Sequence, residues 1–248
     1  MLSLVTGASS GIGLQYATQL ARDYHSDLLL VSNQEKELAE VAQNLKNEYG
    51  VNTIPHYADL SKPEAADLLF AYCKENGLVV DVLINNAQAS ASGVSIAQHT
   101  TEQFDLAIYS GLYATFYYMK ACYPYLKETQ GTVINFASGA GLFGNFGQCS
   151  YAAAKEGVRG LSRVAATEWA KDGINVNVIC PLAWTAQLEN FEKAYPEAFK
   201  ANVKMPPAGH YGDPEKEIAS VCVHLASPDM KYLTGETLTL EGGMGLRP

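Results

Sequence analysis

The sequence predicts an α/β protein in which a parallel sheet of about seven strands carries helices on both faces, a doubly wound arrangement. Short runs rich in Leu, Ile and Val alternate with longer amphipathic segments along almost the whole chain. The short runs are apolar throughout, which is typical of strands buried on both faces of a sheet. A glycine-rich turn joins the first run to the first amphipathic segment. Because no linker, repeat or low-complexity segment interrupts the pattern, we expect a single domain over residues 1–248.

Hydrophobic periodicity and punctuating residues predict the elements in order. Gly50 is placed to end a charged amphipathic helix, and Pro63 is placed in the first turn of the next one. The expected strands are Leu2–Val5, Asp27–Ser32, Asn52–Ala58, Val79–Asn85, Thr132–Ala137, Asn175–Cys180 and a last one near Leu238–Leu240. The expected helices are Ile12–Asp23, Gln34–Tyr49, Pro63–Asn76, Thr101–Lys127, Tyr151–Lys171 and Pro214–Ala226.

Residues 182–212 break this alternation and are expected to form a long irregular segment after a strand. Ligands of open α/β sheets bind outside the carboxyl ends of the strands, so an aromatic segment at this place is typical of a substrate lid. The alternative is an insertion that contacts a second subunit. The large apolar residues of the segment are Trp184, Phe191, Tyr195, Phe199, Pro206 and Pro207.

Composition excludes several classes of function. A formal net charge of −9 without clustered Lys or Arg disfavours nucleic acid and anionic membrane as partners. The five scattered cysteines form no CxxC pair, which indicates a reduced protein with buried thiols, and we expect it in the cytoplasm because no signal peptide or spanning segment is evident. The histidines lack metal-site spacing, and GxSxG and Walker-type motifs are absent, so no metal site, hydrolase or ATPase is expected.

The glycine-rich turn predicts a dinucleotide site. Glycines at such a turn let the backbone approach a pyrophosphate, and the following helix offers free N–H groups and the positive end of its dipole. Three glycines alone would fit a structural turn equally well, but the strand before and the helix after them favour the ligand site. The candidate contacts are Gly7, Ser9, Ser10, Gly11, Ile12 and Gly13.

A tyrosine and a lysine are placed for acid–base chemistry. Tyr151 and Lys155 are four residues apart on an expected helix and so share one face. The pKa of a free tyrosine is about 10. An adjacent ammonium that lowered this pKa by about three units would stabilise the phenolate by roughly 4 kcal/mol. Such pairs are also common on solvated helix faces. Ser138 ends the preceding strand, where its hydroxyl is placed to hydrogen-bond a substrate oxygen beside the tyrosine.

Five motifs together resemble the short-chain dehydrogenase/reductase family, in its short single-domain branch with members similar to 3-oxoacyl-acyl-carrier-protein reductase. They are the TGxxxGxG turn at Thr6–Gly13, Asp59-Leu60, Asn85-Asn86-Ala87, the stretch 173–181 and Glu241-Gly242-Gly243. The separation of thirteen positions between Ser138 and Tyr151 also matches the family. The resemblance implies a Rossmann fold and an NAD(P)-dependent oxidoreductase that interconverts a ketone or aldehyde with an alcohol. It makes Ser138, Tyr151 and Lys155 catalytic, with Lys155 lowering the pKa of Tyr151.

The resemblance also implies further cofactor contacts, at Asp59, Leu60, Asn86, Ala87, Tyr151, Lys155, Pro181 and Thr185. An acidic residue at the end of the second strand would hold the ribose diol of NAD, whereas a nearby base would accept the 2′-phosphate of NADP. Ser32 and Asn33 occupy this place and are neither. Without a carboxylate to repel a phosphate, charge favours NADP over NAD, and NAD stays open as the alternative.

Three positions depart from the family pattern. Gly111 stands where the family has an Asn that holds a water next to the lysine, and Gln88 replaces the last glycine of NNAG. The threonine expected to bind the nicotinamide carboxamide lies one place early, at Thr185. These departures leave open a catalytically impaired dinucleotide-binding protein that acts as a regulator or scaffold. An epimerase or dehydratase is disfavoured, because the short C-terminal region leaves little room for an extra substrate domain. By resemblance alone we expect a homotetramer or a homodimer.

Overall fold

Seven parallel strands form one sheet in the order β3-β2-β1-β4-β5-β6-β7. This computed structural model describes residues 1–194 and 196–245, except the side chains of residues 187, 191, 194, 198, 201 and 202. The strands are β1 (Leu2–Thr6), β2 (Asp27–Ser32), β3 (Thr53–Tyr57), β4 (Val82–Asn85), β5 (Thr132–Phe136), β6 (Asn175–Pro181) and β7 (Thr237–Leu240). The predicted fold class, a Rossmann-type doubly wound sheet, is confirmed.

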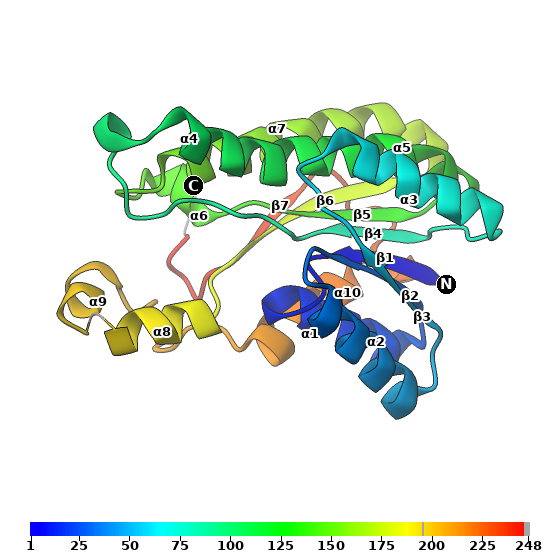
Figure 1. The fold of residues 1–248 in the computed structure, drawn as a ribbon, viewed down its shortest axis with the longest axis horizontal. Coiled ribbons are helices and arrows are strands. Elements are labelled where there is room, and N and C mark those ends of the chain that lie inside the picture. The colour runs from blue at the N-terminus through cyan, green and yellow to red at the C-terminus, as the bar shows by residue number, and fades with distance from the viewer. Residues whose placement is uncertain (195, 246–248) are drawn as a thin grey trace.

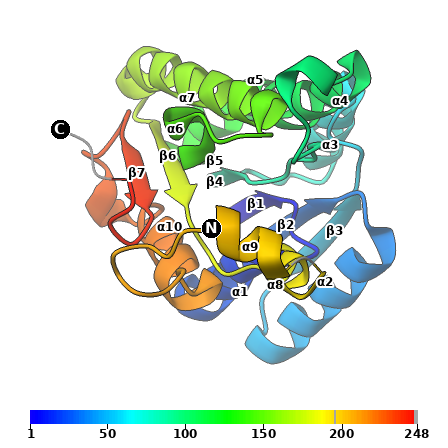
Figure 2. The same ribbon diagram turned by 90° about the vertical axis from the view of Figure 1, so that its left-hand side faces the viewer.

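Helices cover both faces of the sheet, as Figures 1 and 2 show. One face packs α1, α2 and α10 into a core that includes Leu20, Leu38 and Cys222. The other packs α3, α5 and α7 into a second core around Leu69 and Tyr118. The helices are α1 (Gly11–Tyr24), α2 (Glu35–Tyr49), α3 (Pro63–Glu75), α4 (Thr101–Ala107), α5 (Ala114–Thr129), α6 (Gly139–Phe143), α7 (Cys149–Trp169), α8 (Ala186–Ala194), α9 (Pro196–Asn202) and α10 (Ser220–His224).

The order of the strands locates a crevice for a ligand. The chain builds β2 and β3 on one side of β1 and then crosses to place β4 on its other side. Sheets of this kind bind ligands where the winding direction reverses, outside the carboxyl ends of the strands. The glycine-rich turn follows β1 and the Asn85-Asn86-Ala87 segment follows β4, so both motifs lie at this reversal.

The helix expected over residues 101–127 is not regular. A π-helical stretch, η2 (Ile108–Tyr113), separates α4 from α5 and contains Gly111. The Thr115 hydroxyl donates a hydrogen bond to the Gly111 carbonyl at 2.8 Å. Helical periodicity carries no signal for one inserted residue, whereas a glycine in mid-helix weakens the regular winding. Such bulges are frequent at functional sites.

The expectation of an irregular stretch at 182–212 was wrong. Two short helices, α8 and α9, lie within it. The sequence prediction also missed α6, which follows β5 and is only five residues long. Short helices depend on tertiary contacts for most of their stability, so local pattern predicts them poorly.

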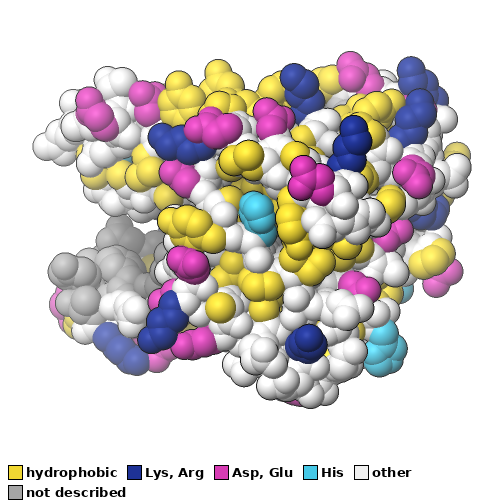
Figure 3. All heavy atoms as spheres, turned by 45° about the vertical axis from the view of Figure 1, so that its right-hand side comes forward, with side chains coloured by type: hydrophobic (Ala, Val, Ile, Leu, Met, Phe, Trp, Pro, Cys, Tyr) yellow, Lys and Arg dark blue, Asp and Glu magenta, His cyan; other side chains and the backbone are white. Residues whose placement is uncertain are grey.

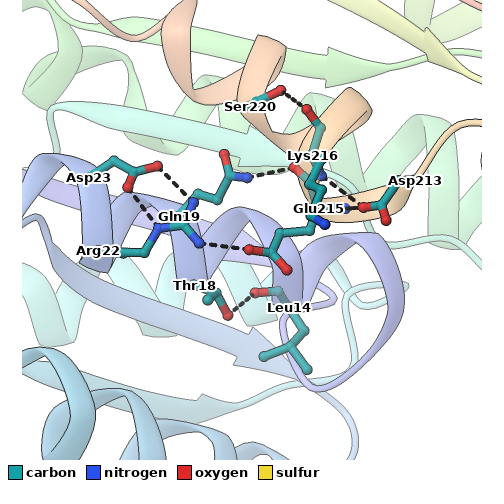
Figure 4. A network of polar contacts seen from close by, with 9 residues as sticks. All are labelled: Leu14, Thr18, Gln19, Arg22, Asp23, Asp213, Glu215, Lys216 and Ser220. Atoms are coloured by element: carbon teal, nitrogen blue, oxygen red, sulfur yellow. Dashed lines mark hydrogen bonds and ion pairs between the residues drawn. The ribbon is translucent and has the colours of Figure 1, made fainter.

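The segment that contains α8 and α9 is closed at its base. An isolated bridge pairs Ala183 with Gly212, and the Trp184 N–H donates to the Gly212 carbonyl at 3.0 Å. Directly after this segment, η4 (Pro214–Ala219) is held against α1 by a hydrogen bond and an ion pair. Gln19 Nε2 donates to the Glu215 carbonyl at 2.5 Å, and Arg22 forms an ion pair with the Glu215 carboxylate at 2.6 Å, as Figure 4 shows.

Asp213→Ala is expected to lower the free energy of unfolding by about 1 kcal/mol, because it removes a helix cap. The Asp213 carboxylate accepts hydrogen bonds from the N–H groups of Glu215 and Lys216 at 2.9 and 2.8 Å. Urea unfolding of both proteins measures the difference. Asp67→Ala is the matched control, since Asp67 is exposed on α3. Equal losses in the two variants would mean that the cap contributes nothing specific.

Candidate active site

The turn between β1 and α1 brings backbone very close to backbone. Gly7 and Gly11 have φ angles of +68° and +57°, the left-handed region that favours glycine. A Cβ atom on Gly13 would lie 2.2 Å from the Gly7 carbonyl oxygen, so any side chain there would push α1 off the turn. Ser10 precedes α1 as its extended N-cap residue. The first amides of α1 therefore face the crevice without intrahelical partners, as an anion site requires.

Two serines and a glutamine shape the corner at the end of β2. The hydroxyls of Ser9 and Ser32 lie 2.8 Å apart, and Ser9 donates to Gln34 Oε1 at 2.7 Å. Ser32 is buried, whereas Asn33 is exposed. The sequence predicted Ser9, Ser32 and Asn33 as cofactor contacts but missed Gln34, which was assigned to the start of a helix. None of these four residues has a carboxylate side chain that could face a ribose.

The loop after β4 is fastened to the glycine turn by Thr6. Its hydroxyl oxygen accepts hydrogen bonds from the N–H groups of Asn86 and Ala87 at 3.0 and 3.2 Å. Asn86 Nδ2 also donates to the Thr6 carbonyl at 3.2 Å. A Cβ atom on Gly7 would lie 2.9 Å from that same Nδ2. The predicted contacts Asn86 and Ala87 thus stand beside the turn, and Thr6 is a further member that sequence reasoning did not single out.

Asp59 and Leu60 lie at the carboxyl end of β3, as expected. The Asp59 carboxylate accepts hydrogen bonds from the N–H and hydroxyl of Ser61 at 3.0 and 2.7 Å. Asp59 is exposed, while Leu60 is buried and shares a small cavity with Thr6 and Ala87. The carboxylate therefore holds the local turn, and its outer oxygen stays available to a ligand.

Ser138 stands at the junction of β5 and α6. It is the N-cap of α6, and its Oγ accepts a hydrogen bond from the Ala140 N–H at 3.1 Å. That bond leaves the hydroxyl proton free to donate. Short helices need such a cap, so the sequence at 138–140 fixes the direction of the serine side chain. The hydroxyl also acts on Tyr151, because its hydrogen bond lowers the pKa of the phenol.

Tyr151 and Lys155 lie on one face of the first turns of α7. The ammonium of Lys155 is 5.5 Å from the centroid of the Tyr151 ring. It donates to the Phe136 carbonyl, at the end of β5, at 2.8 Å. Three residues that are 13 and 4 positions apart in the chain therefore meet at the carboxyl end of β5. The neighbour of β5 in the sheet is β4, and the loop that follows β4 is fastened to the glycine turn by Thr6.

Burial dominates the protonation of both groups. Desolvation raises the pKa of Tyr151, and the hydrogen bond with Ser138 offsets part of that rise. Desolvation lowers the pKa of Lys155 to about 8. The predicted lowering of the Tyr151 pKa by Lys155 is thus not present in this arrangement, because the amine lies against the Phe136 carbonyl instead of the phenol oxygen. The Tyr151 phenol is therefore protonated at neutral pH.

Sequence reasoning missed Arg159, one further turn along the same face of α7. Arg159 is buried, and its Nη2 donates to the Ser138 carbonyl at 3.3 Å and to Glu156 Oε1 at 2.9 Å. The i, i+4, i+8 spacing of Tyr151, Lys155 and Arg159 was the available signal. The guanidinium thus holds the backbone of Ser138 in place.

Pro181 and Thr185 lie at the end of β6, where the segment with α8 begins. Pro181 is the last residue of β6. The Thr185 hydroxyl oxygen accepts a hydrogen bond from the Leu188 N–H at 3.3 Å and so caps α8. Its proton remains available to a ligand. Trp184 packs edge-on against Phe199 and Tyr211, with ring centroids 6.1 and 5.9 Å apart. Tyr195 and the side chain of Phe191 lie outside the described residues.

Exposed apolar residues border the catalytic cluster. The loop after β4 pairs with the loop before α7, through a bridge between Val94 and Gln148 and a hydrogen bond from Gly93 N–H to the Gly147 carbonyl at 2.8 Å. These two loops and α6 carry an apolar rim, defined as Ile96, Leu142, Phe143 and Phe146, which are 80, 37, 50 and 83% exposed. Large exposed apolar groups beside a site are typical of surfaces that bind an apolar ligand.

A model of the family described as enoyl-(acyl carrier protein) reductase matches residues 7–245. The chain belongs to the short-chain dehydrogenase/reductase family. This family membership makes it an NAD(P)-dependent oxidoreductase that acts on CH–OH or C=O groups.

Several relatives within this family span nearly the whole chain. The 12alpha-hydroxysteroid dehydrogenase of Clostridium sp. is 56% identical over 253 residues, with 100% of this chain and 97% of that protein covered. The 3-oxoacyl-acyl-carrier-protein reductase FabG of Vibrio cholerae is 34% identical over 98% of this chain and 96% of its own length. The crystal structure of L-sorbose reductase from Gluconobacter frateurii, complexed with NADPH and L-sorbose, superposes with a TM-score of 0.90 at 26% identity, covering 100% of this chain and 97% of that one.

The structure bears on the other classes considered. Within residues 1–194 and 196–245, no three His, Cys, Asp or Glu side chains gather as a metal site would require. None of the helices in that part of the chain has the length and apolar character that crossing a bilayer requires. On the described part of the face drawn in Figure 3, acidic and basic side chains are interspersed without a large patch of one sign. Of the five cysteines, four are buried and Cys149 is partly exposed.

Proposed function

We propose that this enzyme interconverts a secondary alcohol and a ketone on a hydroxysteroid, with NADP as the preferred cofactor. The meeting of Ser138, Tyr151 and Lys155 at the carboxyl end of β5 carries the reaction type. The 56% identity to a 12alpha-hydroxysteroid dehydrogenase over nearly all of both chains supports the substrate class. The apolar rim supports it independently, because a steroid nucleus is a large, rigid, apolar ligand.

The roles of the residues follow from their geometry. For ketone reduction, the Ser138 hydroxyl donates a hydrogen bond to the substrate oxygen and Tyr151 transfers its proton to that oxygen. A nicotinamide cofactor held by the glycine turn and the Asn86 loop would supply the hydride for the carbonyl carbon. Lys155 keeps an ammonium 5.5 Å from the centre of the Tyr151 ring, and it stabilises the phenolate by turning from the Phe136 carbonyl towards the phenol oxygen as the proton leaves. Alcohol oxidation uses the same groups in reverse, with Tyr151 as the base.

A substrate panel tests this proposal. Purified enzyme with NADPH, and separately with NADH, is assayed on 3-, 7- and 12-oxo steroids, a 3-oxoacyl thioester and L-sorbose, by the absorbance of the reduced nicotinamide. We expect turnover of an oxo steroid at a kcat/KM at least about tenfold above the other classes, since the apolar contacts contribute to binding. Preference for the thioester or the sugar would replace the substrate assignment, and inactivity on every compound would contradict the proposed reaction.

The cofactor preference rests on the corner formed by Ser9, Ser32 and Gln34, which offers hydroxyl and amide groups and no carboxylate. Asn33→Asp is expected to weaken NADPH binding by about tenfold or more, since like charges placed side by side are costly, and to leave NADH binding unchanged or tighter. Fluorescence titration measures both constants. Asn44→Asp, exposed on α2, adds the same charge away from the site. An equal effect on NADPH and NADH would refute this assignment of the corner.

We also infer that the enzyme is a homotetramer or homodimer, assembled through a groove between α5 and α7. This groove of about 270 Å³ is lined mainly by apolar side chains, among them Phe116, Leu161, Val164 and Trp169. Phe116 and Val164 are 41 and 55% exposed. Val164→Glu is expected to lower the mass measured by light scattering, because it buries an unpaired charge in the interface. A monomeric wild-type protein would exclude this assembly.

The seven strands of the described residues all belong to one sheet. We therefore propose that residues 1–248 act as one domain that binds the cofactor and performs catalysis. Residues 182–212, including α8 and α9, are then the lid over the substrate. The bridge at Ala183 and Gly212 supports this assignment, since it brings both ends of the segment together at the carboxyl edge of the sheet. We also propose a cytoplasmic enzyme, as the cysteine pattern suggests.

A further inference from the structure

Gln88 and Gly111, the two positions that depart most from the family pattern, are in contact. Gln88 follows β4, whereas Gly111 lies in the π-helical stretch η2. A Cβ atom placed on Gly111 would lie 2.7 Å from Cδ of Gln88, 2.8 Å from its Nε2 and 3.0 Å from its Oε1. The amide of Gln88 thus occupies the space that a side chain at position 111 would need. The glutamine is possible here because position 111 is a glycine.

One end of this amide has an unfilled hydrogen-bonding capacity. Gln88 Nε2 faces the Ala107 carbonyl at 3.5 Å. Gln88 Oε1 is sealed from solvent and has no hydrogen-bond partner among the described residues. Leaving a buried acceptor without a donor costs about 1–3 kcal/mol. A donor is therefore expected at this atom when the enzyme is at work, and a bound water is the smallest group that supplies one.

The register of β4 and β5 brings the segment with Gln88 and the carbonyl that Lys155 contacts to adjacent strand ends. Asn85 pairs with Asn135 across β4 and β5, so Gln88 and Phe136 both follow closely on adjacent strand ends. Phe136 provides the carbonyl that Lys155 Nζ contacts at 2.8 Å, and an ammonium has two further protons to donate. The π-helical stretch η2 also packs on α7 close to Lys155. A Cβ atom placed on Gly157, two residues after Lys155, would lie 2.7 Å from Cδ2 of Leu112 in η2.

We propose that Gln88 is a positioning residue whose amide fills the space left by Gly111 and whose Oε1 holds a water that hydrogen-bonds the Lys155 ammonium. The Gln88 amide then takes the place of a side chain at position 111. Gly111 therefore does not indicate a catalytically impaired site. This inference rests on the proposed role of Lys155 in the reaction. The titratable groups that face the ammonium are Tyr151 from α7 itself and Cys180 from β6.

The decisive variant is Gln88→Met, which keeps the length of the side chain and removes the acceptor. Ketone reduction is followed from pH 6 to about 10, because Lys155 loses its proton at about pH 8 and kcat is expected to fall above that pH. Without the water, the ammonium is less well stabilised, so this fall moves to lower pH by about half a unit or more and kcat drops about tenfold. The dinucleotide Kd is expected to stay within about twofold, since the variant leaves the glycine turn after β1 unchanged.

Matched variants separate positioning from packing. Gln43→Met makes the same exchange at an exposed place on α2 and should behave as wild type. Gln88→Gly removes the amide, and adding Gly111→Asn places an amide in the same space from the other side. We expect the double variant to regain most of the kcat that Gln88→Gly loses, with unchanged melting temperature in all folded variants. Gly111→Asn alone should be impaired, because the two side chains then compete for one space.

The outcomes are decisive in both directions. If Gln88→Met retains the kcat and pH profile of wild type, or if the double variant is no better than Gln88→Gly, the proposal is wrong. Failure of the proposed reaction is distinguishable, because the wild-type protein would then lack turnover on the whole substrate panel.

Discussion

Tyr151→Phe is expected to lower kcat by about 10²–10⁴-fold, because it removes the proton that the substrate oxygen must receive. The ring and its packing stay, and only the hydroxyl beside Ser138 is lost. Dinucleotide affinity should change by no more than about threefold, since the glycine turn and the Asn86 loop are untouched. Steady-state assays with an oxo steroid give kcat, and fluorescence titration gives the Kd for NADPH.

The direction of the Tyr151 pKa shift adds a second observable. Burial raises the pKa of this phenol, so it is protonated and ready to donate at neutral pH. Reduction should therefore be fast at neutral pH, whereas alcohol oxidation, which needs the phenol as a base, should rise with pH. In Tyr151→Phe, both reduction and oxidation should be slow, and neither rate should depend strongly on pH.

Tyr232→Phe provides the control, because it removes the same hydroxyl group from a side chain that is fully exposed. Its rates should equal those of wild type. A Tyr151→Phe enzyme that kept more than about a tenth of its kcat would show that another group transfers the proton, since general acid catalysis is worth more than that.

Lys155→Met is expected to abolish most activity and yet to stabilise the folded protein at neutral pH. The amine is buried, and desolvation lowers its pKa to about 8 from the ordinary lysine value of 10.5. A folded-state pKa below that of the unfolded chain means that the unfolded state binds more protons between these two values. The penalty is therefore fully present below about pH 8 and disappears as pH rises through the window from about 8 to 10.5.

The size of this stabilisation is limited by a lost hydrogen bond. A shift of this size corresponds to about 3 kcal/mol at one pKa unit per 1.36 kcal/mol, and the orphaned Phe136 carbonyl takes back about 1–2 kcal/mol. We expect a net gain of about 1–2 kcal/mol at pH 7, shrinking toward zero or below at pH 10, measured by urea unfolding at both values. The loss of activity should be about 10²-fold or more, because the charge beside Tyr151 is gone.

Lys74→Met is the matched control for the stability measurement. Lys74 is exposed on α3, so its replacement should change the unfolding free energy little and equally at both pH values. A destabilised Lys155→Met protein at neutral pH would show that the buried ammonium has better partners than the Phe136 carbonyl. In that case the low pKa of the lysine would be the wrong explanation for its behaviour.

The strands and their order of appearance were predictable mainly because the central ones, such as β1, β2, β4 and β5, are short runs buried on both faces. Leu28, Leu29, Leu30 and Val31 are fully buried in β2, and nothing in their pattern competes with a strand. The glycine turn was predictable for a similar reason, since its conformation is a local property of Gly7, Gly11 and Gly13. The two helices after β6 were not, because short helices form only when the rest of the protein supports them.

By itself, the amino-acid sequence determined the doubly wound sheet, the dinucleotide turn and the presence of Ser138, Tyr151 and Lys155 at spacings that bring them to one strand end. These features depend on short-range geometry, which local residue types specify. Only the tertiary structure decided that Gln88 enters the space beside Gly111, that Arg159 supports the Ser138 backbone and that Lys155 points at the Phe136 carbonyl. Each of these contacts joins residues from different elements, and their distance in space is set by how the helices pack on the sheet.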